Sequence, residues 1–340
     1  MSGHSLAARL PPDAWRISRI IRERKGKRSD MVERELEHFN LGQICRSGQC
    51  FRMERETGVS GSGAKEPISG GSRYTDNVAG MSYPGSLEHD CPNPDDGIYR
   101  ILAGYRSLRV EQQGSRFRFS CSEEDMEAFW AGYFDLDRDY GAFMSRINPR
   151  DSYLLHAAGA GSGIRILRQD LWEMIVSFLI SQQNNIVRIR RCIRNLCETY
   201  GERIEDPEGR VYYAFPLPQA LAGLEEDALK ACNLGYRSRY VVRAARSVVS
   251  GELDLGAVGQ MPYRKAREEL LKLFGVGEKV ADCICLFSLH HLEAFPVDTH
   301  ISQALAAHYK RGFPHRRYKD IQGVLQQYMF YYEVEGSGGG

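Results

Sequence analysis

The sequence predicts an α+β fold, in which an N-terminal antiparallel β-sheet domain with helices precedes a mainly α-helical, two-lobed core. Apolar and polar residues alternate between Tyr99 and Cys121, and this period of two is typical of strands. From Asp170 onward the apolar residues recur with the period of about 3.6 that marks helices. Within the helical part, Gly275 and Gly277 separate two such helices, which predicts a helix-hairpin-helix motif.

Composition narrows the class of protein. The chain has 340 residues, of which 42% are hydrophobic, so it can bury the core of one large domain or of a few ordinary ones. No segment approaches the roughly 18 consecutive apolar residues of a membrane span, and no signal peptide is evident, so we expect a soluble intracellular protein without a membrane partner. Nine cysteines scattered through helical patterns favour reduced thiols over disulfides. The net charge is only +1, so any nucleic-acid contact must come from a local patch.

The expected domain organisation follows the changes of pattern along the chain. We expect a basic flexible tail (1–30), an N-terminal α+β domain (31–150) with an insertion (55–95), a helical domain (165–334) and a disordered tail (335–340). The basic tail is a solvated terminus on composition, although its arginines and lysines also suit phosphate contact or targeting. The insertion is rich in Gly, Ser, Pro and Asn and lacks periodicity, which indicates a long loop.

The N-terminal domain has three local signals. The segment Phe39–Met53 contains short apolar runs around a glycine turn, and we expect strands there. Gln113-Gly114 should form the turn between two later strands. Ser122, with Asp125 three residues later, predicts a capping box that opens a helix through Trp130.

A calcium loop is excluded in the segment that follows. Asp135, Asp137 and Asp139 imitate the start of such a loop, but Tyr140 replaces the required glycine and Arg146 stands where a bidentate glutamate is needed. We therefore expect no metal site.

The helical domain begins with an interrupted amphipathic pattern. An apolar face starts after Asp170, stops at the polar run Gln182–Asn185 and resumes from Ile186. Four successive amide side chains do not suit a buried core. A second helix-turn-helix is expected in residues 216–250, with Leu234–Arg237 at its turn.

The second helix-turn-helix carries a local positive charge. Between Asp227 and Glu252 the charged residues are all basic, namely Lys230, Arg237, Arg239, Arg243 and Arg246. Such a run fits either a phosphate-facing surface or an ordinary solvated helix face, and composition leaves both readings open.

The helix-hairpin-helix motif carries the chemical clue. Glycines at the turn allow positive φ and leave backbone N–H groups free at the N-terminus of the next helix, where a phosphate can bind. Lys279 lies in the first turn of that helix, and Asp298 follows after a break at Pro296. Taken singly, such a lysine is an ordinary surface residue and such an aspartate is an ordinary N-cap. What they do together is indicated by a family resemblance.

Residues 275–285 (GVGEKVADCIC), followed by residues 296–300 (PVDTH), resemble the helix-hairpin-helix DNA glycosylases and, within them, the 8-oxoguanine DNA glycosylases. The resemblance extends with gaps from about Phe39 to Val334. It implies a glycosylase core that releases 8-oxoguanine opposite cytosine from duplex DNA in base excision repair and then nicks the strand as an AP lyase. It also implies a monomer that needs no cofactor and works in the cytoplasm, nucleoid or nucleus.

The resemblance also implies a role for individual positions of this chain. Lys279 would attack the sugar C1′ and form an imine, and Asp298 would assist the amine and stabilise the developing sugar cation. The base pocket would consist of Gly48, Cys283, Gln326 and Phe330, with the Gly48 carbonyl accepting the extra N7 hydrogen of the lesion. Contacts to DNA would come from Gln183, Arg188, Tyr236, Arg237, Gly275, Gly277 and His300. The family usually places Asn where this chain has Gln183, so the filling of the space left by the base is in question.

Two alternatives remain at this point. A related glycosylase for alkylated purines would be monofunctional, would typically lack the lysine and would use Asp298 to assist water. A non-catalytic module would use the helix-hairpin-helix only to grip the DNA backbone. A product assay distinguishes the monofunctional alternative from the lyase, because an enzyme that uses the lysine nicks the strand and a monofunctional enzyme leaves an intact abasic site. The pairing of Lys279 with Asp298 counts against the non-catalytic module.

Overall fold

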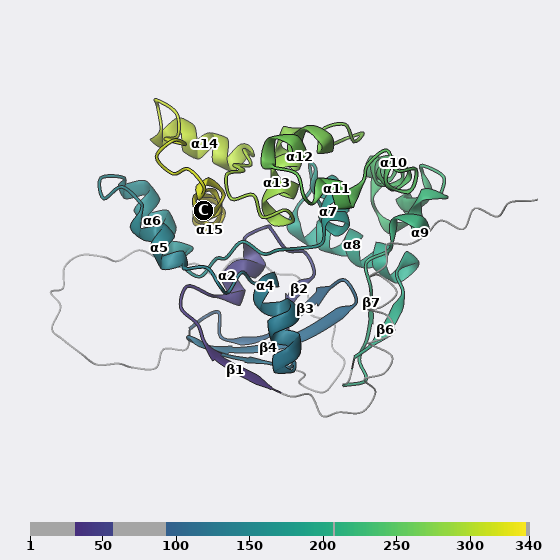
Figure 1. Ribbon diagram of the computed structural model, residues 1–340, viewed down its shortest axis with the longest axis horizontal. Helices are drawn as coiled ribbons and strands as arrows, with labels where there is room; N and C mark the ends of the chain where they lie inside the picture. Colours follow the sequence, from purple (N-terminus) through teal and green to yellow (C-terminus); the bar gives the residue numbers. More distant parts are fainter. Residues whose placement is uncertain (1–30, 57–92, 207, 338–340) are drawn as a thin grey trace, which may run out of the picture.

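The computed structural model describes residues 31–56, 93–206 and 208–337, and it confirms the predicted fold class. A five-stranded antiparallel sheet lies on one side of the molecule, and the long helices of the core lie above it (Figure 1). The predicted tail 1–30 and most of the predicted insertion 55–95 lie outside the described residues.

The sheet has the strand order β1-β5-β4-β3-β2. Its strands are β1 (Val32–Glu35), β2 (Met53–Arg55), β3 (Gly97–Ala103), β4 (Arg106–Gln113) and β5 (Arg116–Phe119). The predicted alternation is confirmed, because the buried Leu108 and Val110 of β4 pair with the buried Ile101 and Tyr99 of β3. The predicted turn is also present, with Gly114 at a φ of 58°.

The expectation of strands between Phe39 and Met53 is largely wrong. Leu41–Arg46 forms helix α2, whose N-terminus is capped by the Asn40 side chain accepting a hydrogen bond from the Gln43 N–H at 2.9 Å. Leu41, Ile44 and Cys45 have helical spacing and bury one face of this helix. An apolar run this short is compatible with the period of a strand and with that of a helix. The Asn40 cap favours the helix.

The predicted capping of the next helix is confirmed. The Ser122 side chain accepts a hydrogen bond from the Asp125 N–H at 3.1 Å and starts α3 (Glu123–Asp125). A π-helical segment (Met126–Trp130) and α4 (Ala131–Tyr133) follow directly. Their aromatic side chains pack on the inner face of the sheet and form the core of the N-terminal part.

The remaining described helices form the core. They are α5 (Tyr140–Ser145), α6 (Ser152–Ala160), α7 (Leu171–Ser181), α8 (Ile186–Tyr200), α9 (Pro218–Ala222), α10 (Ser238–Val249), α11 (Leu255–Val258), α12 (Tyr263–Leu270), α13 (Glu278–Phe287), α14 (Thr299–His308) and α15 (Gln322–Ser337). Helices α5, α6, α14 and α15 group on one side, and α7 to α13 on the other (Figure 1). The helix-hairpin-helix is therefore α12, its turn and α13, with Gly275 and Gly277 between the two helices as predicted.

The C-terminal helix corrects one predicted boundary. Helix α15 continues to Ser337, so three residues of the segment 335–340 predicted as a disordered tail are helical. Residues 338–340 lie outside the described residues.

Two expectations from composition concern the state of the cysteines and membrane-spanning segments. The eight described cysteines are buried and unpaired, as the reduced thiols predicted from the sequence require. Among the described residues, no helix combines the length and the hydropathy that a membrane span needs.

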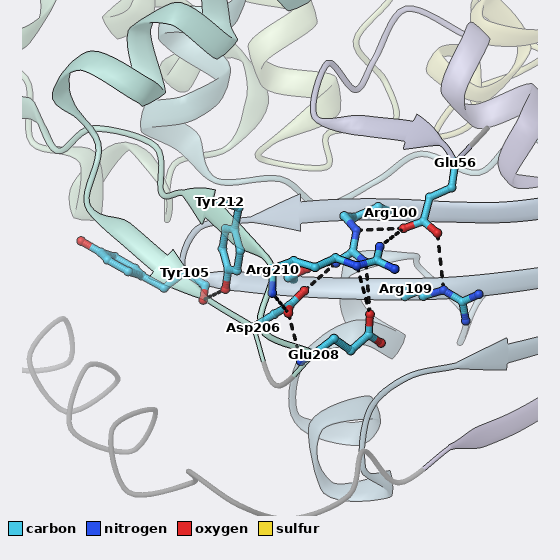
Figure 2. Close-up of polar contacts among 9 residues, drawn as sticks. Glu56, Arg100, Tyr105, Arg109, Asp206, Glu208, Arg210 and Tyr212 are labelled. Carbon is cyan, nitrogen blue, oxygen red and sulfur yellow. Dashed lines mark hydrogen bonds and ion pairs between the residues drawn. The ribbon is translucent and has the colours of Figure 1, made fainter. Parts of the chain in front are cut away.

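A short hairpin attaches the core to the outer face of the sheet. It consists of β6 (Arg203–Glu205) and β7 (Val211–Tyr213). Ion pairs join it to β3, β4 and the end of β2, and we call this cluster the hairpin clamp; it comprises Glu56, Arg100, Arg109, Asp206, Glu208 and Arg210 (Figure 2). Arg100 is central, with Nε 3.0 Å from Glu56 Oε1 and Nη1 2.7 Å from Asp206 Oδ2.

Candidate active site and DNA-binding face

The predicted catalytic and base-pocket residues meet in one place. A small cavity of about 30 Å³ lies where α7, α13, α15 and the turn after α2 come together. All six predicted residues line it: Lys279, Asp298, Gly48, Cys283, Gln326 and Phe330. These positions span 283 residues of sequence, from Gly48 to Phe330, so only the tertiary fold brings them together.

Lys279 reaches the cavity from the first turn of α13. Its Nζ lies 5.4 Å from the centre of the Phe178 ring, which α7 supplies. One turn further on, the buried Cys283 interacts with the lysine. Burial raises the pKa of the Cys283 thiol to about 11, although hydrogen bonding and charge from Lys279 act in the opposite direction. The thiol is therefore neutral at physiological pH and forms an uncharged wall of the cavity.

Asp298 is held by the start of α14. Its Oδ1 accepts a hydrogen bond from the Ile301 N–H at 2.9 Å, so it is the N-cap of that helix. It also lines the cavity beside Lys279, although the two side chains form no ion pair in the described part of the chain. The capping role therefore fixes the orientation of the carboxylate without removing it from the site.

The cavity is narrow, and two of its predicted walls lie close together. Gly48 has a φ of 72°, and a Cβ at this position would lie 3.1 Å from Phe330 Cε1. The His300 ring stands edge-on to Phe330, with centroids 6.1 Å apart. The volume of about 30 Å³ suits water molecules and not a purine ring. The cavity must therefore widen before a base can enter.

The amide of Gln326 is satisfied by its neighbours. Its Nε2 donates to the Pro296 carbonyl at 3.0 Å, and Gln327 Nε2 donates to its Oε1 at 3.2 Å. Gln327 also lines the cavity and was missed from the sequence. Two adjacent glutamines on one helix give no signal as to which of them faces a site.

Phe178, which lines the cavity, and Asp282, which supports the helix of Lys279, were also not identified from the sequence. Phe178 appeared in the sequence only as one member of the apolar face of α7, and nothing in that pattern separates it from core residues. Asp282 accepts hydrogen bonds from the Tyr263 hydroxyl and from Arg267 Nε, each at 2.7 Å. It thereby ties α12 to α13 and fixes the direction in which Lys279 leaves the helix.

The two glycines of the hairpin have different roles. Gly275 has a φ of 91°, and a Cβ there would lie 2.7 Å from Tyr240 Cγ, so only glycine fits. The expectation of positive φ is wrong for Gly277, whose φ is −97°. A Cβ added at Gly277 would meet no heavy atom within 4 Å, and the residue is the N-cap of α13. Its missing side chain leaves the N-terminal N–H groups open to an anion.

The predicted DNA-contacting loops are hydrogen-bonded to one another. Arg237 is only 6% exposed and donates to the Gln182 and Gln183 carbonyls, the latter at 2.9 Å. Gln182 Nε2 in turn donates to the Gly275 carbonyl at 3.0 Å. The loops after α7, before α10 and before α13 therefore form one continuous face. Gln183, Arg188 and Tyr236 are exposed on it, whereas Arg237 is held inside.

The basic run near α10 is partly neutralised by acids just outside it. Arg243 Nε lies 2.7 Å from Glu226 Oε1, and Lys230 Nζ lies 2.8 Å from Asp227 Oδ2. Arg239 is exposed and has no ion pair or hydrogen bond within the described residues. Composition left open whether these residues face phosphates or are an ordinary solvated helix face. The ion pairs of Lys230 and Arg243 fit the solvated helix face for that part of the run.

Family models match nearly the whole described chain. The model for the 8-oxoguanine DNA glycosylase N-terminal domain matches residues 31–175, and the model for the HhH-GPD superfamily base excision DNA repair protein matches residues 176–324. The chain belongs to the 8-oxoguanine DNA glycosylase family. Its curated relatives include an N-glycosylase/DNA lyase of Saccharomyces cerevisiae, 34% identical over 220 residues, and a probable N-glycosylase/DNA lyase of Methanothermobacter thermautotrophicus, 30% identical over 227 residues.

The matches to these relatives are partial. They cover 60% and 58% of this chain, and 58% of the yeast protein and 71% of the archaeal protein. Solved structures match over more of the fold. The apo form of the 8-oxoguanine glycosylase/lyase of Clostridium acetobutylicum is 33% identical, with a TM-score of 0.73 over 89% of this chain and 96% of that chain. Its complex with duplex DNA containing cytosine opposite 8-oxoguanine is 31% identical, with a TM-score of 0.73 over 92% and 100%.

Proposed function

We propose that this family member is a bifunctional DNA glycosylase and AP lyase that excises 8-oxoguanine opposite cytosine during base excision repair. The observation that carries the proposal is the joint presence of an amine and a helix-held carboxylate, Lys279 and Asp298, in one cavity beside the helix-hairpin-helix. The names of its relatives support the reaction, and the bound duplex of the Clostridium protein supports the substrate. We further propose a monomer with two domains, residues 31–150 and 165–334.

The first step is extrusion of the damaged nucleotide. A stacked base is inaccessible at its sugar carbon, so it must rotate out of the duplex at a cost of a few kcal/mol. Tyr236 and Gln183, both exposed on the DNA-binding face, would occupy the space that the base leaves. The extruded base enters as the pocket widens and then stacks on Phe330, with Cys283 as the opposite wall. The Gly48 carbonyl accepts the N7 hydrogen that distinguishes 8-oxoguanine, and Gln326 binds the pairing edge.

The second step is displacement of the base. The neutral Lys279 amine forms a bond to C1′ while the bond from C1′ to the base N9 breaks, and the departing base takes up a proton. Asp298 stabilises the positive charge that develops on the sugar. Ring opening gives an imine between Lys279 and C1′. Loss of a proton from C2′ then expels the 3′ phosphate by β-elimination, and water releases the product from the lysine.

Recognition of the opposite cytosine requires a rearrangement. Arg188 is already exposed near the N-terminus of α8, where it can approach the unpaired base. Arg237 is bound to the Gln182 and Gln183 carbonyls and would have to exchange those contacts for the cytosine. Arginine offers several donors to base acceptors, which suits either residue for this role.

Borohydride trapping tests the proposal. Wild-type protein is incubated with duplexes that carry 8-oxoguanine, guanine or an alkylated purine opposite cytosine. We expect a covalent complex on the 8-oxoguanine duplex alone, and Lys279→Gln should abolish it while retaining DNA binding. The matched control is Lys272→Gln, because Lys272 is an exposed lysine of the same motif, paired with Glu269 at 2.7 Å. Trapping retained by Lys279→Gln, or base release from the alkylated duplex without nicking, would contradict the assignment.

A further inference from the structure

Three aromatic rings lie in a row beside the hairpin of the helix-hairpin-helix. Tyr236 and Tyr240 have ring centroids 5.7 Å apart, and Tyr240 and Phe274 have centroids 5.3 Å apart. Both contacts are edge-to-face, which is a favourable geometry for aromatic pairs. We call these three residues the aromatic ladder. It joins the turn before α10 to the residue that immediately precedes Gly275.

The two ends of the aromatic ladder are open to solvent. Phe274 is 46% exposed and Tyr236 is 40% exposed. Single exposed apolar side chains are common on protein surfaces, but a continuous row of rings that is exposed at both ends indicates a binding surface. The middle ring has a structural task, because Tyr240 packs against the Gly275 backbone where a Cβ would otherwise stand. Phe274 has no comparable task on its solvent side.

Each ring of the aromatic ladder carries an arginine. The guanidinium carbon of Arg237 lies 4.6 Å from the Tyr236 centroid, that of Arg239 lies 5.7 Å from Tyr240, and that of Arg243 lies 4.2 Å from Phe274. Arg237 donates hydrogen bonds to backbone carbonyls, and Arg243 forms an ion pair with Glu226. Arg239 keeps its hydrogen-bonding capacity, since within the described chain it forms no hydrogen bond or close ion pair, although its charge acts on Glu226 from a longer distance.

The aromatic ladder spans two predicted DNA contacts. At one end the Tyr236 hydroxyl lies 3.5 Å from the Gln182 carbonyl, and at the other end Phe274 adjoins the hairpin glycines. A duplex that touched both the loop after α7 and the N-terminus of α13 would therefore pass over the row. Its backbone alternates an apolar sugar face with a phosphate, which matches an exposed ring beside a free guanidinium.

We propose that the aromatic ladder is an additional DNA-binding surface, on which Phe274 packs against a deoxyribose next to the hairpin and Arg239 binds the adjoining phosphate. This inference rests on the proposed function, because it takes duplex DNA as the ligand. The contact is independent of the lesion, so it contributes to the affinity for any duplex and leaves the chemical step at Lys279 unchanged.

Salt-dependent binding to an undamaged duplex tests the two contacts separately. Arg239→Gln should lower the slope of log affinity against log salt by about one, because one phosphate contact is lost. Phe274→Ala should weaken binding about fivefold to tenfold without a change of slope, because only apolar contact is lost. Arg116→Gln, at an exposed arginine of the sheet, and Val249→Ala, at an exposed end of α10, are the matched controls and should bind like the wild type.

The outcomes distinguish this inference from the proposed function. Single-turnover trapping on the 8-oxoguanine duplex should be unchanged in the matched controls Arg116→Gln and Val249→Ala. Wild-type affinity and slope in Arg239→Gln, an exposed position whose change does not endanger folding, would overturn the inference, as would wild-type affinity in folded Phe274→Ala. If the wild type binds duplex with these ladder effects but forms no trapped complex, the proposed chemistry fails and the binding surface stands.

Discussion

The N-terminal sheet and the helical core meet in two places of opposite character. Near the active-site cavity, the contact is a buried seam made by Gln49, Arg52, Arg165, Gln169 and Glu173. Gln49 Nε2 donates to the Arg165 carbonyl at 3.0 Å, its Oε1 accepts from the Leu167 N–H at 2.9 Å, and its carbonyl accepts from Gln169 Nε2 at 2.8 Å. On the outer side, the contact is the hairpin clamp of partly exposed ion pairs (Figure 2).

The difference shows which contact positions the site. Buried polar groups must keep their partners, because an unpaired one costs its full desolvation free energy. Gln49 directly follows Gly48, so the buried seam fixes where the pocket turn stands relative to α13 and α15. The ion pairs that the half-exposed Arg210 makes in the hairpin clamp are screened by salt and contribute little each. We therefore expect the buried seam to define the geometry and the hairpin clamp to adjust stability.

The largest expected effect comes from breaking the buried seam. Gln49→Leu keeps the shape of the side chain but leaves the Leu167 N–H and the Arg165 carbonyl unpaired in the interior. The free energy of unfolding should fall by roughly 4 kcal/mol, measured by urea denaturation. Gln113→Leu, at an exposed glutamine of the sheet, should change it by less than about 0.5 kcal/mol. A loss below about 1 kcal/mol in Gln49→Leu would remove the distinction between the two contacts.

The buried seam should also respond to rising pH. Burial raises the pKa of Glu173 to about 7, despite Arg52 at 3.3 Å. Because this pKa lies above the unfolded value near 4.5, the carboxyl contributes stability below that value and loses it as pH rises toward 7. The wild type should lose on the order of 2 kcal/mol of stability across this window relative to Glu173→Gln. Denaturation curves at a series of pH values check this, and parallel curves for the two proteins would contradict it.

The hairpin clamp should respond in the opposite direction and more weakly. Burial alone would raise the pKa of Glu56, but hydrogen bonds and charge from Arg210 and Arg100 lower it below its ordinary value of 4.5. A depressed carboxyl pKa contributes stability above the unfolded value and loses it as pH falls further. Glu56→Gln should therefore lower the melting temperature only slightly at neutral pH, by the equivalent of less than about 1 kcal/mol.

Measuring the stability of these variants at high salt distinguishes the two contacts further. The difference in melting temperature between Glu56→Gln and the wild type should vanish in about 1 M salt, where charges are screened within about 3 Å. The effect of Gln49→Leu should persist there, because its hydrogen bonds are uncharged and buried. An equal salt response of the two variants would show that the two contacts do not differ as described.

Sequence reasoning succeeded where the signal is local or carried by a motif. The period of two over β3 to β5 and the cap at Ser122 are local, and the structure has both of them. It failed at α2, whose six residues are too few for a period to emerge. Lys279 and Asp298 were found because they belong to a motif that recurs in a family.

Other parts of the site have no sequence signal at all. Arg237 is withdrawn from solvent by the carbonyls of Gln182 and Gln183, and any residue in that loop would offer the same acceptors. Glu56 meets Arg210 only because the sheet and the β6–β7 hairpin fold against each other. Contacts of this kind depend on backbone positions set by the whole fold, so neither spacing nor residue type reveals them.

The narrow pocket beside Gly48 and Phe330 would give the proposed enzyme an energetic threshold. Every extruded base, damaged or not, would meet the same narrow pocket, and its apparent affinity would be reduced by the fraction of molecules in which the pocket has widened. Because this cost is common to guanine and 8-oxoguanine, it lowers both affinities by the same factor and leaves their ratio unchanged. Discrimination would therefore come from the contacts to the base itself, while the opening cost would lower the fraction of time that any undamaged base occupies the pocket.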